Sequence, residues 1–443
     1  MKPKIMLFSH ICNAIYITGA EKLLLFFVQE ILPQYHCVIV VPNEGALTHQ
    51  ARALGAEIII LPCPLLYLIY QPTDYIKAEL ELLKQKDAWG HILYLLRTNN
   101  PDIVMTNTCV HALPVVAAKS LGIPTIWQIT ETMEQNEWTH LSVEIIHQNA
   151  DVILGISEAT VRSFVGEDVR KKITILPPSW RMEELQPEAW GHNRISKRKQ
   201  LRIQESSMLI GYISSYIYPS KGLYHFIKMA LQICEEYSFT EFVIIGKPKD
   251  ETYFQKCISL IQNSKYFHRF HFIRFEANIQ AVYPAMDIVV VPSLSHEGFG
   301  MTALEGLIFG KPVIAYRSGG LSEILQATGN SEYLVDVGDI DGLAACVRDL
   351  LSHPFRVHQV GARNHLHVQA AFGIDKYRMD LQNVLAKPEL HVKKSPAASS
   401  VRAAKKMSRV KRTKTSAKGK KRKRVIRVKR KRSSRRNKSG RRR

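Results

Sequence analysis

Continuous runs of apolar residues alternate with amphipathic segments along most of the chain. Runs of this kind are typical of strands in a parallel sheet that helices cover on both faces. The pattern therefore predicts an α/β protein. In the first half we expect helices at 22–31, 46–54, 74–96 and 113–120, and strands at 4–9, 36–42, 57–61, 103–106, 125–129, 152–155 and 173–176.

The alternation stops near residues 177–207, where polar residues show no clear period, and then starts again. Such a break is typical of an interdomain linker or a surface excursion. The second half predicts helices at 221–236, 341–352 and 356–386, and strands at 208–213, 241–245, 271–274, 287–291, 312–315 and 333–335. We therefore expect two tandem, doubly wound, Rossmann-like domains facing a cleft, with ligands at the carboxyl ends of the strands.

The domain division that we predict has five parts. They are a first domain at 1–185, a linker at 186–207, a second domain at 208–360, a helical region at 361–388 and a tail at 389–443. The tail changes the meaning of the net charge of +22, because 26 of the 61 Lys and Arg residues lie in 392–443, which has no Asp or Glu. The rest of the chain then carries 35 basic against 39 acidic residues and is slightly acidic.

The basic tail has almost no apolar residues, and its like charges repel, so we expect it to be disordered. It could bind a polyanion: nucleic acid, anionic lipid or an anionic envelope polymer. A simple solubilising role is the alternative. The seven cysteines are scattered and form no CxxC pair, which fits a reducing cytosol and argues against a zinc site or disulfide framework. We see no signal peptide and no transmembrane segment.

Residues 291–325 combine a glycine turn with two glutamates. A strand ends at Val291, Gly298-Phe299-Gly300 follows, and a helix is expected to begin at Met301 or Thr302. Glycines at such a turn let backbone N–H groups approach an anion, and the helix N-terminus adds positive potential. The turn therefore predicts a diphosphate site, although a plain tight turn is the alternative.

Glu297 lies before this turn, and Glu305 lies about one turn into the expected helix. A carboxylate at Glu305 can accept two hydroxyls, as a ribose requires. Two exposed acidic residues near a helix start are the alternative. Lys221, followed by Gly222, comes after the strand at 208–213 and could neutralise a diphosphate leaving group without a metal, or could simply be solvated.

The first domain has candidates at the ends of its strands. Gly19 could touch phosphate or only allow the chain to turn. Glu131 could bind an acceptor hydroxyl, with Thr130 beside it, or both could be an ordinary polar strand end. His10 and His111 each follow an apolar strand and could be a general base or a polar lining residue.

Several motifs together resemble the retaining glycosyltransferases of family 4, the glycosyl transferases group 1 type, which have the GT-B fold. The resemblance covers roughly residues 1–385 and is more specific in the second half. The matching segments are Gly19-Ala20-Glu21-Lys22, Val104-Met105-Thr106-Asn107-Thr108, Gly122-Ile123-Pro124, Ile156-Ser157-Glu158-Ala159-Thr160, Lys221-Gly222, Glu297-Gly298-Phe299-Gly300 through Glu305, Gly310-Lys311-Pro312-Val313 and Gly319-Gly320-Leu321-Ser322-Glu323-Ile324.

This resemblance implies an enzyme that moves a sugar from a nucleotide diphosphate sugar, most simply a UDP-sugar, to a glycan, lipid or protein acceptor with retention and without a metal or other cofactor. Glu305 would take the ribose hydroxyls, and Glu297 would contact the donor sugar. Lys221 and the backbone of Gly298, Phe299, Gly300, Met301 and Thr302 would hold the diphosphate, and the first domain would bind the acceptor.

The chain departs from the family pattern at two places. Many members have an arginine five or six positions before the lysine of the Lys-Gly pair, where this chain has Tyr216 and Ser215. Many also have a histidine where this chain has Thr130. A second hypothesis is therefore a catalytically weak scaffold in a spore coat or cell envelope, tethered through the tail. A third is nucleic-acid binding by the tail alone. The body resembles bacterial proteins, and we expect it in the cytoplasm or at the edge of a membrane or spore coat.

Overall fold

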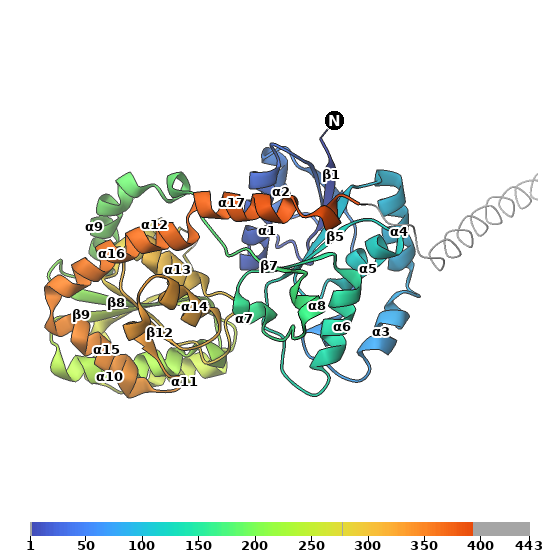
Figure 1. Ribbon diagram of the computed structural model, residues 1–443. Helices are drawn as coiled ribbons and strands as arrows, with labels where there is room; N and C mark the ends of the chain where they lie inside the picture. Colours follow the sequence, from blue (N-terminus) through green and yellow to red (C-terminus); the bar gives the residue numbers. More distant parts are fainter. Residues whose placement is uncertain (1, 277, 393–443) are drawn as a thin grey trace, which may run out of the picture.

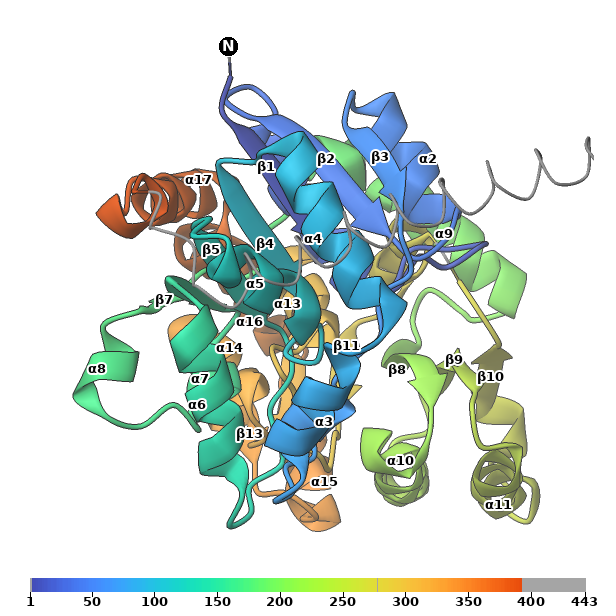
Figure 2. The ribbon, with the colours of Figure 1, turned by 90° about the vertical axis from the view of Figure 1, so that its right-hand side faces the viewer.

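The computed structural model describes residues 2–276 and 278–392 of the chain. Two parallel sheets form two lobes, and helices cover both faces of each sheet (Figure 1, Figure 2). The α/β architecture with two Rossmann-like domains is therefore confirmed. The expected disordered tail lies outside the described residues except at its start, where Leu390 is buried in the first lobe.

The first sheet has seven strands in the order β3-β2-β1-β4-β5-β6-β7. They are β1 (Lys4–Phe8), β2 (His36–Val41), β3 (Glu57–Ile60), β4 (Ile103–Asn107), β5 (Thr125–Ile129), β6 (Val152–Gly155) and β7 (Ile173–Ile175). The helices of this lobe are α1 (Gly19–Ile31), α2 (Ala46–Ala53), α3 (Ile76–Leu83), α4 (Asp87–Asn99), α5 (Ala112–Ser120), α6 (Thr139–Asn149), α7 (Glu158–Val161) and α8 (Glu167–Arg170).

The second sheet has six strands in the order β10-β9-β8-β11-β12-β13. They are β8 (Met208–Ile217), β9 (Thr240–Pro248), β10 (Phe270–Ile273), β11 (Ile288–Val291), β12 (Val313–Tyr316) and β13 (Leu334–Val335). Its helices are α9 (Trp190–Leu201), α10 (Leu223–Glu236), α11 (Glu251–Gln262), α12 (Ile279–Val282), α13 (Met301–Ile308), α14 (Gly320–Ala327), α15 (Ile340–Ser352) and α16 (Pro354–Phe372), followed by α17 (Ile374–Leu385).

Helix α1 begins at Gly19, three residues before its predicted start. The cause is a capping box: the Thr18 side chain accepts from the backbone N–H of Glu21, and Glu21 accepts from the N–H of Thr18 at 2.8 Å. This arrangement satisfies two N–H groups that the helix cannot pair internally. Gly19 is therefore the first residue of a helix and not part of a loop.

Three other expectations differ from the structure. The single helix expected at 74–96 is two helices, α3 and α4, and the helical region at 356–386 breaks at Gly373. The stretch 186–207, expected to be a linker, contains α9, which buries Arg198 against the second lobe. Helix α6 was not predicted. The precise domain boundaries stay a prediction.

The last helix crosses back to the first lobe. Tyr377, Leu381 and Val384 of α17 lie in the same hydrophobic cluster as Ile5 of β1 and Leu24 of α1. Glu30 of α1, whose side chain is 5% exposed, pairs with Arg181 and with Arg378 of α17. The chain therefore passes between the lobes twice, before α9 and after α16 (Figure 1).

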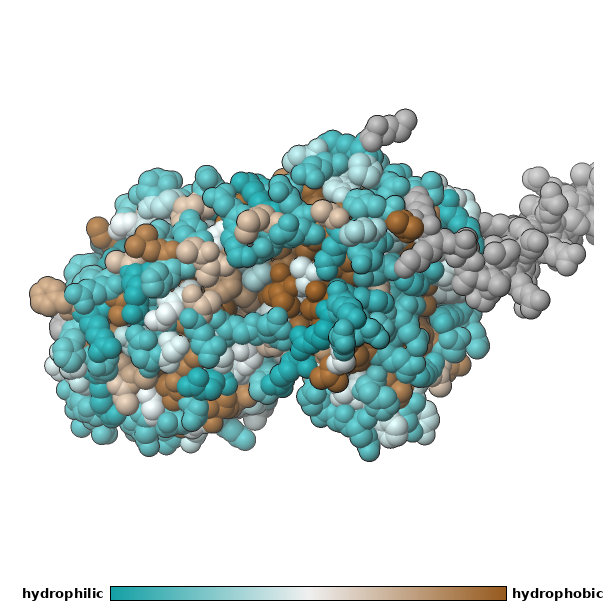
Figure 3. Space-filling view, viewed as in Figure 1, coloured by the Kyte–Doolittle hydropathy of each residue, from teal (hydrophilic) through white to brown (hydrophobic). Residues whose placement is uncertain are grey.

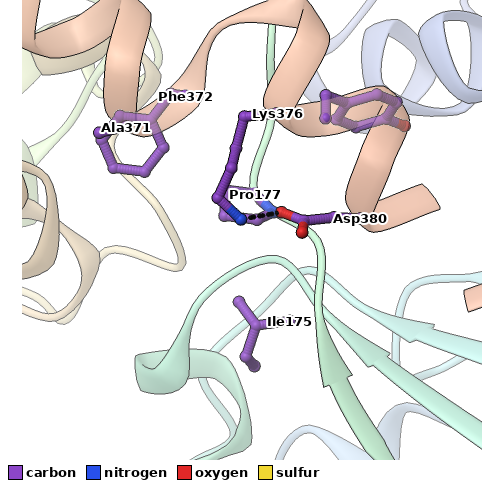
Figure 4. Close-up of a pocket in the computed structure, with 7 residues that line it drawn as sticks. Ile175, Pro177, Ala371, Phe372, Lys376 and Asp380 are labelled. Atoms are coloured by element: carbon purple, nitrogen blue, oxygen red, sulfur yellow. Dashed lines mark hydrogen bonds and ion pairs between the residues drawn. The ribbon is translucent and has the colours of Figure 1, made fainter. Parts of the chain in front are cut away.

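A small cavity of about 180 Å³ lies beside the second crossing (Figure 4). Its lining includes Pro177 of the first crossing and Phe372 of α16, together with Lys376 and Asp380, which form an ion pair 2.5 Å long. Within the described ranges, no helix combines the length and apolar composition that crossing a bilayer requires.

Candidate functional site

The strand-turn-helix predicted around Glu297 is present, and α13 begins at Met301. Gly300 is its N-terminal cap, with a φ of +109°, and a Cβ there would lie 2.5 Å from Cδ2 of Leu321. Only glycine adopts this conformation without strain. A parallel bridge joins Glu297 to Gly319, and the Gly320 N–H donates to the Glu297 carbonyl at 2.9 Å. Two glycine loops therefore fix the turn.

Lys221 and Glu297 meet, although they lie in different loops. The Lys221 ammonium donates to Oε1 of Glu297 at 2.6 Å, and the Ser293 hydroxyl donates to the same oxygen at 2.6 Å. Gly222 makes this approach possible: with a φ of +72°, it packs so closely on the loop after β11 that a Cβ would lie 1.8 Å from the Pro292 carbonyl oxygen. The structure thus joins two predicted site residues into one ion pair.

Glu305 lies on α13 and is held by Tyr283, a buried residue that belongs to none of the predicted motifs. The Tyr283 hydroxyl donates to Oε2 of Glu305 at 2.8 Å. The same hydroxyl lies 3.3 Å from the Thr302 carbonyl oxygen, a second acceptor. Burial raises the pKa of the Glu305 carboxyl, against the opposing effects of Lys22 and the Tyr283 hydrogen bond. Lys22 belongs to α1, so a charge of the first lobe acts on a carboxyl of the second.

His10, His111, Thr130 and Glu131 follow β1, β4 and β5, which are neighbours in the first sheet. Glu131 accepts from the Cys109 N–H at 3.1 Å. Burial, and to a lesser extent repulsion by the nearby His10, lowers the pKa of His111 to about 3. This imidazole is therefore neutral at pH 7. Burial also lowers the pKa of His10, although Glu131 opposes that shift.

Buried polar atoms gather around these strand ends. Within the described part of the chain, several have no partner in good hydrogen-bonding geometry: His10 Nδ1, Asn107 Oδ1, His111 Nδ1 and Nε2, Gln128 Oε1 and Thr130 Oγ1. Asn107 nevertheless lies close enough to act on the pKa of His10, and the Phe8 backbone on that of His111. Buried polar groups in proteins normally have partners, so a cluster of orphaned atoms marks a place where hydroxyls or water fit. Asn107 and Gln128 are additions to the predicted set, and they come from the same strand ends.

The turn also contacts the first lobe directly. A Cβ at Gly298 would lie 2.3 Å from the Thr130 carbonyl oxygen, and the Gly298 carbonyl accepts from the Ser157 hydroxyl at 2.5 Å. Glu323 of α14 accepts from the N–H groups of Glu158 and Ala159 at the start of α7, at 2.9 and 2.6 Å. The turn is therefore in contact with both lobes, which a notch separates in the space-filling view (Figure 3).

Tyr216, which stands where an arginine is common in the family pattern, contacts the first lobe as well. Its hydroxyl hydrogen-bonds with that of Tyr16, and the Tyr16 ring lies 5.9 Å from the ring of Phe275. The position thus joins the loop before α1 to the second lobe. Gly19 lies near this contact in the sequence, but a Cβ there would meet nothing within 4 Å.

Comparison with solved structures identifies the fold. Anabaena HepE in complex with UDP superposes with a TM-score of 0.71 at 16% identity, over 87% of this chain and 100% of that one. The same protein in complex with UDP-glucose gives a TM-score of 0.70 at 16% identity, over 86% and 99%. Together with the two parallel sheets, this defines the chain as a GT-B protein.

The family described as glycosyl transferases group 1 matches residues 193–366, which contain Lys221, Glu297 and Glu305. Over these residues the second lobe matches the glycosyltransferases of this type. It is 27% identical, over 288 residues, to a GDP-mannose-dependent monoacylated alpha-(1-6)-phosphatidylinositol monomannoside mannosyltransferase of Corynebacterium glutamicum, covering 62% of this chain and 73% of the relative. It is 30% identical to D-inositol 3-phosphate glycosyltransferase of Corynebacterium urealyticum, over 47% of this chain and 50% of the relative.

Proposed function

We propose that this glycosyltransferase moves a hexose or related sugar from a nucleotide diphosphate sugar, UDP-linked, to an acceptor hydroxyl with retention at the anomeric carbon. The observation that carries the proposal is the convergence of Lys221, Ser293 and Glu297 at the turn before α13, with Glu305 on that helix. UDP is favoured because Anabaena HepE, which has the same fold, has been solved with UDP and UDP-glucose.

Each donor contact follows from the chemistry of these groups. Glu305 accepts the ribose hydroxyls, and the N–H groups from Gly298 to Thr302 at the start of α13 face the diphosphate. An ammonium has three donors, so Lys221 can keep its bond to Glu297 and still reach a phosphate oxygen. Glu297 is thereby oriented toward the donor sugar. Lys221 and the helix N-terminus supply positive charge, so we propose that no metal ion is needed.

In the proposed reaction the bond between the anomeric carbon and the diphosphate oxygen breaks, and the acceptor oxygen forms a bond to the same face of that carbon. The acceptor proton passes to the departing diphosphate oxygen. Lys221 stabilises the negative charge that develops on the diphosphate, an effect of the kind that typically contributes a factor of about 10²–10³ in rate.

We propose that the acceptor binds at the strand ends of the first lobe, where His10, His111, Thr130 and Glu131 lie. Neutral imidazoles, amides and hydroxyls are suited to an uncharged polyhydroxyl group, because each can donate or accept according to need. The orphaned buried atoms there support a hydroxyl-bearing acceptor. The acceptor that we propose is a hydroxyl group of a glycan, a lipid or a protein.

Calorimetric titration with UDP and GDP tests the donor site. We expect UDP to bind to the wild type, and Glu305→Ala to weaken binding at least tenfold. Glu188→Ala is the control, because Glu188 is exposed and lies outside the site. Binding of neither nucleotide, or equal binding by Glu305→Ala, would contradict the proposal and favour a non-catalytic scaffold. We also expect activity to survive chelation of divalent ions, because the proposed reaction needs no metal ion.

We also propose that residues 392–443 bind a polyanion, on the strength of their 26 Lys and Arg residues and the absence of Asp and Glu. These residues have no aromatic side chain, which argues against base stacking. Affinity should fall steeply with salt, since each neutralised phosphate releases counterions. Binding of duplex DNA and of anionic vesicles by the full chain and by a chain ending at residue 391 tests this. Equal binding by the two chains would refute it.

A further inference from the structure

A groove of about 680 Å³ lies on the second lobe, at the amino-end edge of the sheet and away from the strand ends that carry Glu297 and Lys221. Helices α9 and α16 form its sides, and the end of α13 forms its floor. Its volume is within the range of small-molecule sites. The side chains that matter for its chemistry are Trp190, Arg194, Phe309, Lys311, His358 and His365.

The charge of the groove favours an anion. Arg194, Lys311, His358 and His365 can be positive, while Asp287 is the acidic residue among the described lining. Asp287 is already neutralised, because it pairs with Arg194 at 2.9 Å and Arg198 at 3.2 Å and accepts from the Leu209 N–H at 2.7 Å. Its oxygens are therefore occupied, and Arg194 is used in the same pairing. Lys311 is the lysine or arginine of the described lining that no ion pair with a carboxylate engages.

Lys311 is the group best placed to receive an anion. Its ammonium donates to the Pro284 carbonyl at 3.2 Å, one long bond for a group with three donors. Burial lowers the pKa of Lys311 to about 8, against the opposing effect of Asp287, so the ammonium is mainly protonated at pH 7. Burial removes water from this ammonium, and a bound anion would compensate the charge.

The aromatic wall indicates what the anion is attached to. The Trp190 and Phe309 rings lie 4.5 Å apart, and the indole N–H is already donated to the Leu185 carbonyl at 2.7 Å. Trp190 therefore offers only apolar ring surface. Aromatic faces of this kind pack against flat apolar groups. The complementary ligand is an anion that carries a planar ring.

The floor of the groove connects it to the predicted donor site. Phe309 stacks on Tyr283, with ring centroids 5.3 Å apart and planes 7° from parallel. The Tyr283 hydroxyl in turn donates to Glu305. A ligand that shifts Phe309 therefore acts, through one buried ring, on the carboxylate that we assign to the ribose.

We propose that this groove binds a small phosphate-bearing molecule with a planar ring, and that its binding changes nucleotide affinity through Phe309, Tyr283 and Glu305. The proposed binding of the ligand follows from the groove alone. The proposed change in nucleotide affinity rests on the proposed function of Glu305. Coupling between two sites in proteins is typically 5- to 150-fold in affinity, and it is reciprocal.

Phenyl phosphate is a suitable probe, because it has the anion and the ring but no nucleoside. We expect calorimetry to detect binding to the full chain, and both Lys311→Met and Ala362→Glu to weaken it at least tenfold. Ala362 is exposed on α16 at the groove, so Ala362→Glu adds bulk and negative charge without disturbing the core. Ala370→Glu is the matched control, the same change at an exposed position of α16 outside the groove.

The coupling is read from UDP and GDP titrations with and without saturating phenyl phosphate. We expect at least a fivefold change in the affinity of the nucleotide that binds, and loss of this change in Tyr283→Phe, which keeps the ring stack but lacks the hydroxyl. If phenyl phosphate does not bind, or binds equally well to Ala362→Glu, the groove is not the proposed ligand-binding site. Nucleotide binding that phenyl phosphate leaves unchanged overturns the coupling. If neither nucleotide binds, the proposed function and the coupling fail together, while the probe titration still decides the groove.

Discussion

At the scale of single residues, the candidate site depends on contacts between positions far apart in the chain. Lys221 and Glu297 each follow a strand, and their position at a strand's carboxyl end was enough to nominate them. Their ion pair was not predictable, because it depends on how closely the Gly222 backbone packs on Pro292. Tyr283 was missed for a related reason. It belongs to no motif, and only the folded chain brings its hydroxyl to Glu305.

The first prediction concerns the charge of Lys221. We expect Lys221→Met to lower kcat about 10²-fold, because the diphosphate would leave without its ammonium. The melting temperature should change little, since the Lys221 and Glu297 side chains are both partly exposed. Steady-state kinetics with a hydrolysable donor measure the effect, and Lys256→Met, on the exposed face of α11, is the control. Turnover equal to the wild type would remove Lys221 from the mechanism.

The second prediction concerns the pH dependence of stability at Glu305. Burial raises the pKa of this carboxyl in the folded chain above its unfolded value of about 4.3. Below the unfolded pKa both states are protonated and the shift has no effect. As pH rises through the folded pKa, the unfolded chain releases its proton more readily, and wild-type stability is lost.

Glu305→Gln cannot ionise, so it escapes this loss. We expect its free energy of unfolding, relative to the wild type, to rise between about pH 4 and about pH 7. Urea unfolding at both pH values measures it, and Glu188→Gln should show no such trend. A difference that is constant with pH would mean that the carboxyl titrates normally. Nucleotide binding should nevertheless weaken in Glu305→Gln, because an ionised acceptor is lost.

At the scale of elements, apolar runs predicted the positions of the strands, because most strands are buried on both faces. The edge strands β3, β7 and β10 are partly exposed. The polar composition of 186–207 predicts a linker, whereas the structure has helix α9 there, which polar groups tie to its lobe. Arg198 is fully buried, donates to the carbonyls of Ala285, Gln204 and Ser207 and pairs with Asp287. Hydrophobic periodicity does not detect such a helix. The start of α1 was also placed wrongly, although the Thr18 to Glu21 spacing is that of a capping box and is enough to predict it.

The third prediction tests the return of α17. We expect Glu30→Gln to lower the free energy of unfolding by about 2 kcal/mol at pH 7, because two guanidinium groups lose a buried charged acceptor. Hydrogen bonds from Arg378 and Arg181 lower the pKa of Glu30 despite its burial. The contribution of this carboxylate is therefore present above the unfolded pKa and is lost as pH falls through the folded one.

Thermal unfolding of Glu30→Gln at about pH 7, and again in acid below the folded pKa, checks this sign. The gap from the wild type should close in acid. A matched change on an exposed pair, Glu236→Gln beside Arg348, should cost less, since solvent screens surface ion pairs and they contribute little to stability. Equal losses in the two variants would mean that α17 is not held through Glu30.

At the scale of the whole molecule, the motifs of the family resemblance turn out to contact one another across the lobes. Glu323 accepts from the N–H groups of Glu158 and Ala159, and Gly298 lies against Thr130. The sequence predicted that these segments carry site residues. It could not show that they contact one another, because hydrophobic patterns report only on the core within each domain. The relation between the two domains follows from contacts of backbone and polar groups.

The fourth prediction tests that relation. In Gly298→Ala the added Cβ would lie 2.3 Å from the Thr130 carbonyl, so the loop or the lobes must shift. We expect the radius of gyration from X-ray scattering to increase and nucleotide affinity to fall about tenfold, since a misplacement of about 1 Å can cost that much or more. Gly191→Ala is the control, because a Cβ there meets nothing within 4 Å. Unchanged scattering and affinity would show that the contact is dispensable.

The two passages of the chain between the lobes restrict how the lobes can move. Two domains joined by a single chain segment can rotate about it in any direction. Two domains joined by two separate segments are restricted to a hinge rotation about the axis that passes through both. The passages before α9 and after α16 define such a line. A rotation about that line would open or close the face that carries Gly298 and Thr130 while the lobes stay aligned. A cut in either passage would leave the halves connected but free to twist, and the site would lose its alignment without losing any of its residues.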